Sequence, residues 1–207
     1  MDIAIIDYGV GNLRSVQKGF EHAGVEGVHI TDDTARAAAA DGIVLPGVGA
    51  FRDAARNLRD SGMWDVVMDR VAAGVPLLGI CVGLQLLATV GLEDGEWEGL
   101  GLIPGSCERL PAGVKIPHIG WNTVEYPVAS RLFAGIDAGE AFYFVHSYRL
   151  VPEDDSCIIG AVEYGVPFAA AVQSGNVYAV QFHPEKSSSM GLRLLANFGR
   201  IVEEQTV

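Results

Sequence analysis

The sequence predicts an α/β fold, a single domain with a mostly parallel central sheet flanked by helices and additional antiparallel strands in its C-terminal half. Two observations support this. Short apolar runs alternate with helical stretches over the first ninety residues, which is typical of parallel strands joined by crossover helices. The second half carries short extended segments separated by Gly, Pro and Asp. We find no internal repeat and no linker, so residues 1–207 are expected to form one domain.

The elements of the first half follow from apolar spacing and from start and stop signals. Leu13, Val16 and Phe20 recur at helical spacing, and Gly24 is a candidate C-cap. Residues 31–33 can cap the short alanine-rich helix that follows them. The expected strands cover residues 2–7, 25–30, 42–45 and 76–80. Pro46 is expected to end the third of these strands. The other expected helices cover residues 13–23, 50–59 and 64–73, with 84–88 inside a further helix.

The second half changes character from about residue 99 to residue 181. Its expected strands cover residues 141–145, 157–162, 168–173 and 177–182, and their short length and flanking turns favour antiparallel pairing. A last helix is expected over residues 189–203.

Composition excludes several classes of protein. The net charge of −12 argues against a nucleic-acid partner, because phosphate binding needs basic patches. No run of about 20 apolar residues is present, so no membrane span is expected. The first residues, MDIAIIDYG, lack the basic start and long apolar core of a signal peptide, which favours a cytoplasmic location.

The cysteines suggest neither a disulfide framework nor a structural zinc site. There are three, an odd number without CxxC spacing. Cys107 and Cys157 have no motif around them, and ordinary burial is the expectation for both.

Cys81 is the candidate nucleophile. The segment GICVG (79–83) lies between an apolar strand and a helical stretch, which is the glycine-flanked nucleophile elbow of hydrolases with cysteine in place of serine. A helix N-terminus at this point favours the reactive thiolate, and the amide of Val82 can point at an oxyanion. The alternative is a buried core cysteine, which the strand–elbow–helix context disfavours.

His183 is the preferred general base, oriented by Glu185. His183 follows an apolar strand, and residues i and i+2 of a strand face the same side, so the carboxylate could meet the imidazole. The alternative is a surface pair. His118 and His146 lack a carboxylate within three positions, but spacing alone does not exclude them; His22 and His29 are expected to have no catalytic role.

The segment PGVGAF (46–51) is a candidate oxyanion loop after the third strand. Acyl transfer needs one amide from the elbow and one from another strand-end loop, and the two glycines give the backbone around Val48 unusual freedom. A plain turn is the alternative. A dinucleotide site is not expected, because the third glycine of G-x-G-x-x-G is missing here and at residues 9–11.

Taken together, these segments resemble a known family, the class I glutamine amidotransferases. GICVGLQLL (79–87) resembles its nucleophile motif, and AVQFHPEKS (179–187) resembles its His–Glu motif. Further segments resemble one branch, the glutaminase subunits of imidazole glycerol phosphate synthase in histidine biosynthesis. They are PGVGAF (46–51), GLGLIPG (99–105), PHIGWN (117–122), YFVHSY (143–148) and GLRLLANF (191–198).

The resemblance implies a role for each matching position. The catalytic triad falls on Cys81, His183 and Glu185, with oxyanion amides at Val48, Gly49 and Val82. Glutamine contacts fall on Gly49, Gln85, Ser147 and Tyr148, and partner contacts on Asn12, Trp121 and Lys186. Two positions differ slightly from the family's nucleophile motif, because Val82 and Leu84 stand where leucine and methionine are usual. Residues 91–98 also look less typical and are expected to form a surface loop.

The resemblance also implies a reaction and a partner. Glutamine would be hydrolysed to glutamate and ammonia through a thioester, without metal or cofactor. Ammonia would pass to a (β/α)₈ cyclase subunit that makes imidazole glycerol phosphate and an aminoimidazole carboxamide ribotide. Members often show little glutaminase activity alone, so the loop around Val48 is the expected switch.

Two other functions remain open from the residues. One is a glutaminase serving anthranilate, guanylate or pyridoxal phosphate synthesis, against which PHIGWN and GLGLIPG argue. The other is a non-catalytic partner or regulatory module on the same fold, which the three intact triad residues disfavour.

Overall fold

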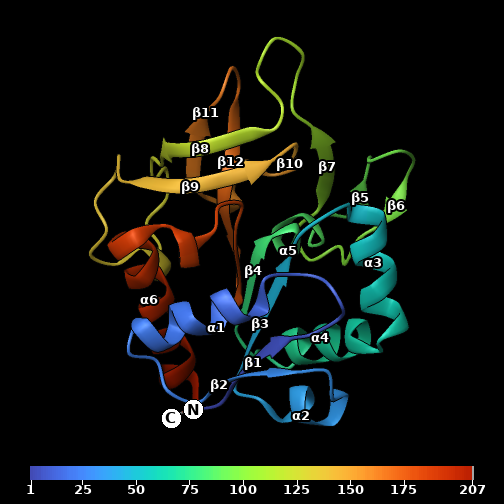
Figure 1. Cartoon of the computed structure of the whole chain (residues 1–207), viewed down its shortest axis with the longest axis vertical. Helices are drawn as coiled ribbons and strands as arrows, with labels where there is room; N and C mark the ends of the chain where they lie inside the picture. Colours follow the sequence, from blue (N-terminus) through green and yellow to red (C-terminus); the bar gives the residue numbers. More distant parts are fainter. Residues whose placement is uncertain (207) are drawn as a thin grey trace.

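A seven-stranded sheet runs through the middle of the protein in the order β11-β12-β13-β4-β3-β1-β2. The computed structural model describes residues 1–206. Five neighbouring strands of this sheet are mutually parallel, and two strands at one edge are added by antiparallel pairing. The predicted fold class is therefore confirmed, and Figure 1 shows the sheet with helices on both sides.

Four of the five parallel strands are apolar and deeply buried, as expected for strands covered on both faces, while the edge strand β2 is mostly half-buried. Every residue of β1, β3, β4 and β13 is buried. The five parallel strands are β1 (Ile3–Ile6), β2 (Val28–Thr31), β3 (Gly42–Gly47), β4 (Leu77–Cys81) and β13 (Val177–Val180).

Helices cover both faces of the sheet. On one side α1 (Leu13–His22) packs against α6 (Ser188–Thr206), and on the other lie α2 (Thr34–Ala39), α3 (Phe51–Asp60) and α4 (Met63–Ala72) (Figure 1). The predicted caps are present. Asp33 accepts hydrogen bonds from the first amides of α2, and Gly24 takes a positive φ of 76° just after α1. None of the helices within residues 1–206 is long and apolar enough to cross a membrane.

The second half adds antiparallel structure above the ends of the parallel strands (Figure 1). The strands β11 (Ile158–Glu163) and β12 (Pro167–Ser174) extend the main sheet. A hairpin joins β8 (His118–Thr123) to β9 (Ala141–His146). The remaining strands form a small sheet in the order β10 (Tyr148–Pro152), β7 (Gly105–Arg109), β5 (Val90–Gly91) and β6 (Trp97–Glu98).

Aromatic packing fixes this added layer to the main sheet. Phe142 of β9 stacks on Phe182, which follows β13, with ring centroids 4.2 Å apart. Phe144 meets the same ring edge-on at 5.5 Å. All three rings are fully buried, and such pairs add to the free energy of burial itself. The segment after β13 is therefore held rigidly beneath β9.

Several predicted element boundaries were wrong, including the following four. The third strand continues through Pro46, because proline loses only its N–H and its carbonyl still accepts a bond, here from the Tyr8 hydroxyl at 2.7 Å. The predicted strand 177–182 ends at Val180. It was expected to be antiparallel, but it pairs parallel with β4 on one side and antiparallel with β12 on the other. The second strand begins at Val28. The helix expected around 84–88 is α5 (Val82–Gln85), which starts immediately after Cys81.

Candidate active site

Three loops meet at one edge of the parallel sheet. Gly47 at the end of β3 pairs with Cys81 at the end of β4, and Val180 at the end of β13 pairs with Ile80. Adjacent parallel strands end at the same edge, which is where α/β sheets place their sites. The segments that follow these three strands carry the predicted oxyanion loop, nucleophile and base.

Cys81 sits in a strained elbow between β4 and α5. Its backbone φ is 58° and its ψ is −108°, a conformation that a non-glycine residue adopts only when its surroundings impose it. The flanking glycines explain how the turn fits. A Cβ on Gly83 would lie 1.8 Å from the Leu45 carbonyl oxygen, and one on Gly79 would lie 2.9 Å from the Gly83 oxygen. The sharp strand-to-helix turn predicted around Cys81 is thus present in the geometry.

The Cys81 sulfur is buried and contacts groups from two other elements. Sγ lies 3.9 Å from the Val145 carbonyl oxygen of β9, to which the thiol donates. The side-chain amide of Gln181 donates to Sγ at 3.8 Å. Neither Val145 nor Gln181 was singled out from the sequence, and only the tertiary arrangement of β9 and β13 around β4 reveals them.

His183 and Glu185 form a buried pair. His183 Nδ1 lies 2.9 Å from Glu185 Oε1, and the two side chains are only 4% and 1% exposed. The contact was predicted for the wrong reason, because β13 ends at Val180 and Glu185 lies in the 3₁₀ helix η3 (Pro184–Lys186). A tight turn, not strand alternation, brings carboxylate and imidazole together.

The backbone of His183 is fixed on both sides. Its N–H donates to the Tyr143 carbonyl of β9 at 2.9 Å, and its carbonyl accepts a bond from the buried hydroxyl of Ser187 at 2.6 Å. Ser187 also accepts a bond from the Tyr143 N–H. Ser187 was not predicted as a site residue, and nothing local in the sequence marks it.

Opposing effects set the charge of His183. Burial is the largest and lowers the pKa of the imidazole. The neighbouring Cys81 sulfur and the Glu185 carboxylate together outweigh it and raise the pKa to about 9. Nε2 is buried and makes no hydrogen bond of normal geometry to the described residues. With Nδ1 turned to Glu185, Nε2 is the nitrogen left for proton transfer on the Cys81 side.

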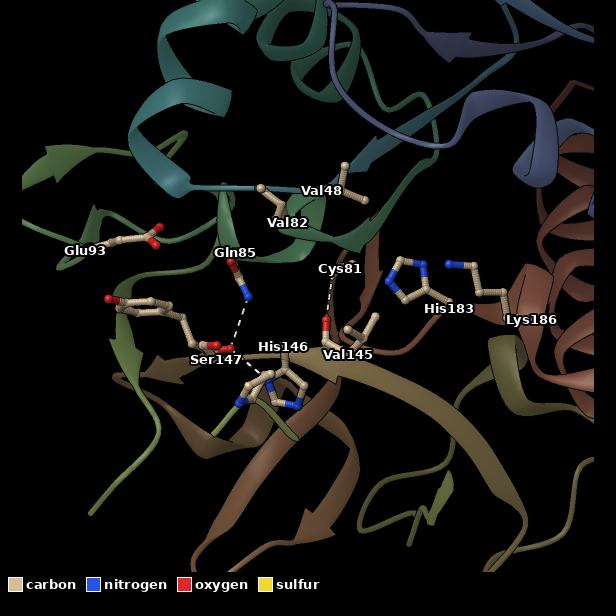
Figure 2. A pocket seen from close by; sticks show the side chains of 13 residues that line it. Val48, Cys81, Val82, Gln85, Glu93, Val145, His146, Ser147, His183 and Lys186 are labelled. Atoms are coloured by element: carbon tan, nitrogen blue, oxygen red, sulfur yellow. Dashed lines mark hydrogen bonds between the residues drawn. The ribbon is translucent and has the colours of Figure 1, made fainter. Parts of the chain in front are cut away.

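A cavity of about 320 Å³ opens over these groups (Figure 2). His183 and Lys186 lie at one end of the view, Glu93 at the other, and Cys81 between them. The walls include all the predicted oxyanion and glutamine-contact residues, namely Val48, Gly49, Val82, Gln85, Ser147 and Tyr148. The structure thus brings together residues that are more than a hundred positions apart.

Glu93 is a wall residue that no local sequence pattern indicated. It belongs to the segment 91–98, which was expected to be a surface loop. Its Oε2 accepts a 2.7 Å hydrogen bond from the Phe51 N–H, at the first turn of α3. A helix N-terminus stabilises a carboxylate, so this charge is held at a defined place in the cavity wall.

The oxyanion candidates differ in their freedom to move. A Cβ on Gly47 would lie 2.7 Å from the Tyr8 hydroxyl and 2.9 Å from Val82 Cβ, so this position is tightly packed. Gly49 has a φ of 94° with open space around it, and Val48 is 42% exposed. The loop is therefore fixed at its first glycine and open at its second.

Gln85 links the cavity wall at Tyr148 to the surroundings of Cys81. Its amide nitrogen donates to the Tyr148 carbonyl at 3.0 Å and to the Gln181 side-chain oxygen at 3.2 Å. The Gln181 amide in turn reaches Cys81. A continuous chain of polar contacts thus runs under the cavity.

His146, left open as an alternative base, lies in the cavity wall but is occupied. Its Nδ1 lies 2.8 Å from the Tyr148 carbonyl oxygen and its Nε2 lies 3.0 Å from His118 Nδ1. Burial lowers the pKa of His146 to about 4, a decrease that the Tyr148 bond opposes and that the nearby His118 and His183 reinforce. With both nitrogens engaged, His146 has none free for Cys81.

The predicted partner contacts lie on different elements. Trp121 of β8 is 54% exposed, with its ring 6.1 Å from that of Tyr143. Lys186 is exposed and lines the cavity, while Asn12 is exposed just before α1 and is not a cavity residue. Their roles toward a partner stay predictions. Within residues 1–206 no three His, Cys, Asp or Glu side chains are grouped to hold a metal ion.

Sequence comparison gives full-length relatives. The family model described as glutamine amidotransferase class-I matches residues 4–202. A protein named imidazole glycerol phosphate synthase subunit HisH from Moorella thermoacetica is 53% identical over 200 residues, covering 97% of this chain and 95% of the relative. The protein of the same name from Aquifex aeolicus is 48% identical over 206 residues and covers 100% of both chains.

Structural comparison finds the same fold at much lower identity. A crystal structure titled glutamine amidotransferase has a TM-score of 0.77 at 20% identity, covering 98% of this chain and 100% of the other. The structure of PurLQS from Thermotoga maritima has a TM-score of 0.71 at 20% identity, covering 100% of this chain and 99% of the matched chain.

Proposed function

This chain belongs to the class I glutamine amidotransferases, and we infer that it is the glutaminase subunit of an imidazole glycerol phosphate synthase. Relatives at about 50% identity over nearly the whole chain carry that name. The structures at 20% identity share the fold and do not choose between acceptor pathways. The reaction assigned here is hydrolysis of glutamine to glutamate and ammonia.

Cys81 is the nucleophile of this reaction. Its thiolate attacks the carbon of the glutamine side-chain amide, forming a C–S bond as the carbonyl electron pair moves to oxygen. The imidazolium of His183 then gives its proton to the amide nitrogen, the C–N bond breaks, and ammonia leaves a thioester behind. The buried Glu185 holds the imidazole by Nδ1 and stabilises its charged form.

Hydrolysis of the thioester reverses the role of His183. The neutral imidazole takes a proton from water, whose oxygen attacks the thioester carbon. Collapse of this second tetrahedral intermediate breaks the C–S bond and returns the Cys81 thiolate and glutamate. The raised pKa of His183, about 9, supports the imidazolium as the resting form that delivers the first proton.

Both tetrahedral intermediates carry an oxyanion, for which the amides of Val82 and of the Val48–Gly49 segment are the proposed donors. Val82 starts a helix directly after the nucleophile. Because Gly47 is packed against Tyr8 and Val82 while Gly49 is open, a rearrangement of this loop is expected after Gly47, and we propose the peptide between Val48 and Gly49 as its place. That peptide is our proposed switch between low and high activity.

Glutamine is proposed to lie along the cavity with its amide at Cys81. The Glu93 carboxylate supplies a negative charge for the α-ammonium group, and the Ser147–Tyr148 segment supplies backbone groups for the α-carboxylate. Gln85 braces that segment through the Tyr148 carbonyl. The separation of Glu93 and His183 at opposite ends of the cavity supports this orientation (Figure 2).

The subunit works with a cyclase, in keeping with the synthase subunit name that its relatives carry. We propose a (β/α)₈ barrel as that partner, which receives ammonia before water can protonate it. Asn12, Trp121 and Lys186 are the proposed contacts. The exposure of Trp121 and of its β8 neighbour Ile119, on the same face of the strand, supports an interface there.

The observation that carries the proposal is the buried His183–Glu185 pair beside Cys81 at one end of a substrate-sized cavity. The test is Cys81→Ala in complex with the cyclase. Synthesis from glutamine should be lost while synthesis from added ammonium salt persists. Loss of both, or retention of the glutamine-dependent reaction, would overturn the assignment.

A further inference from the structure

Two buried histidines lie at the cavity wall on which glutamine is proposed to rest, and one of them, His146, lines the cavity itself. His118 of β8 and His146 of β9 are opposite each other in the strand pair, and their rings are joined by a 3.0 Å contact between His118 Nδ1 and His146 Nε2. They are 3% and 5% exposed. Neither has a part in the proton transfers assigned to His183.

The partners of these rings determine where their protons lie. The Tyr148 carbonyl oxygen can only accept, so the proton at the 2.8 Å contact belongs to His146 Nδ1. A neutral His146 then presents the lone pair of Nε2, and His118 Nδ1 must donate to it. The pair is therefore a one-directional relay of hydrogen bonds from His118 through His146 to the Tyr148 carbonyl.

The relay ends at the Tyr148 carbonyl, in the part of the wall that is proposed to face the substrate. The Tyr148 carbonyl also accepts from the Gln85 amide at 3.0 Å, so two donors from opposite sides hold one oxygen. Ser147 and Tyr148 line the cavity next to this oxygen. Without His146, the carbonyl would keep only the Gln85 bond, and the Tyr148–Arg149 peptide to which it belongs would gain freedom to rotate, which would loosen Tyr148 in the cavity wall.

Packing alone does not require histidines at these two positions. The His118 ring stacks on Tyr164 at 3.9 Å and on Phe144 at 5.0 Å, within an aromatic cluster that also contains Phe168. An apolar aromatic ring would fill this space equally well. Burying the polar nitrogen atoms of a histidine costs free energy unless those atoms are hydrogen-bonded. What phenylalanine could not supply is the hydrogen bond to Tyr148.

We propose that His118 and His146 are positioning residues for glutamine binding, holding the Ser147–Tyr148 segment in the conformation that receives the amino-acid end of the substrate. The proposal rests on the function proposed above, since it takes glutamine as the ligand of this wall. His146 acts through the Tyr148 carbonyl, and His118 acts through His146. Neither residue touches the reacting amide.

The test compares substitutions at His146 in the complex with the cyclase. His146→Phe keeps the aromatic volume but removes the donor, so the KM for glutamine should rise about tenfold, the value of one net hydrogen bond, with a smaller change in kcat. His146→Asn places an amide N–H near the position of Nδ1 and should recover most of that loss. His118→Phe should raise KM by less. His29→Phe, at a histidine of β2 bonded to Asp2, is the control and should not change KM.

Two alkylation rates distinguish a change confined to the Ser147–Tyr148 wall from a general disruption of the active site. Iodoacetamide, with the label on Cys81 followed by peptide mass spectrometry because Cys157 is also a free and partly exposed thiol, reports on the reactivity of the nucleophile itself. The diazoketone analogue of glutamine, 6-diazo-5-oxo-L-norleucine, must first occupy the cavity. In His146→Phe only the second rate should fall, and ammonia-dependent synthesis should persist. An unchanged KM, an equal fall in both alkylation rates, or no recovery in His146→Asn would overturn the proposal. Absence of glutaminase activity in the wild-type complex would instead count against the proposed function.

Discussion

His183 Nδ1 and Glu185 Oε1 lie 2.9 Å apart with both side chains almost fully buried, although only Pro184 separates them in the chain. Because the turn of η3 sets this contact and Ser187 holds the His183 carbonyl, the imidazole has one available orientation toward Cys81. The pair therefore controls both the orientation of the His183 imidazole and its protonation.

Glu185→Gln should lower the pKa of His183 from about 9, because the carboxylate raises it by a hydrogen bond and by its charge. We expect kcat for glutamine hydrolysis to fall by about a hundredfold or more. The imidazole protons of His183, followed by NMR titration, report the pKa directly. A variant with an unchanged titration would show that Cys81 alone sets the charge.

The same shift predicts how stability changes with pH. The pKa of His183 is higher in the folded protein than the ordinary value of 6.5, so its contribution to the free energy of unfolding is full below pH 6.5 and is lost as the pH rises to about 9. Wild type should lose more stability than Glu185→Gln over this window in urea unfolding. Parallel curves for the two proteins would contradict this.

Gly83→Ala should prevent the elbow from forming, because the added methyl group would lie 1.8 Å from the Leu45 carbonyl oxygen and neither backbone can give way. We expect little folded protein, or a Tm lowered by more than about 10 °C. Gly49→Ala is the matched variant, since its position is open and only its φ of 94° is unfavourable. It should fold with a loss of about 1 kcal/mol. Equal Tm values for the two variants would mean that space is not the constraint at Gly83.

The sequence predicted those parts of the site that depend on local order. The elbow around Cys81 is encoded by neighbouring glycines and by strand and helix patterns, and the order of parallel strands then places His183 near it. Glu93, Gln181 and Ser187 could not be found this way, because each reaches the site through contacts with residues forty or more positions away. The occupied state of His146 likewise depends on the pairing of β8 with β9, which no local pattern reveals.

Acid should destabilise the protein through the buried histidine pair. Burial lowers the pKa of His146 to about 4 and lowers that of His118 in the same direction. Between about pH 4 and pH 6.5 the unfolded chain therefore binds a proton at His146 that the folded protein does not. Stability falls with decreasing pH in that window by up to about 1.4 kcal/mol per pH unit for this one group.

Urea unfolding of wild type and His146→Asn at pH 7 and pH 5 isolates this contribution, since the other titrating groups are common to both proteins. The difference in unfolding free energy between the two pH values should be smaller in the variant. An identical difference would indicate that His146 is already protonated in the folded protein at pH 5.

Glu93→Gln should weaken glutamine binding more than it slows chemistry. The amide oxygen of the new side chain can still accept from the Phe51 N–H, which now holds Glu93 at 2.7 Å, so the loop should keep its place. What is lost is the negative charge at the end of the cavity opposite His183 (Figure 2). A charge-assisted hydrogen bond to an ammonium group contributes about 1.5–3 kcal/mol, so KM should rise roughly 10- to 100-fold while kcat changes little. Glu98→Gln, at an exposed carboxylate paired with Arg59, should leave both constants unchanged. A fall in kcat at saturating glutamine would place Glu93 in the chemistry instead of in substrate binding.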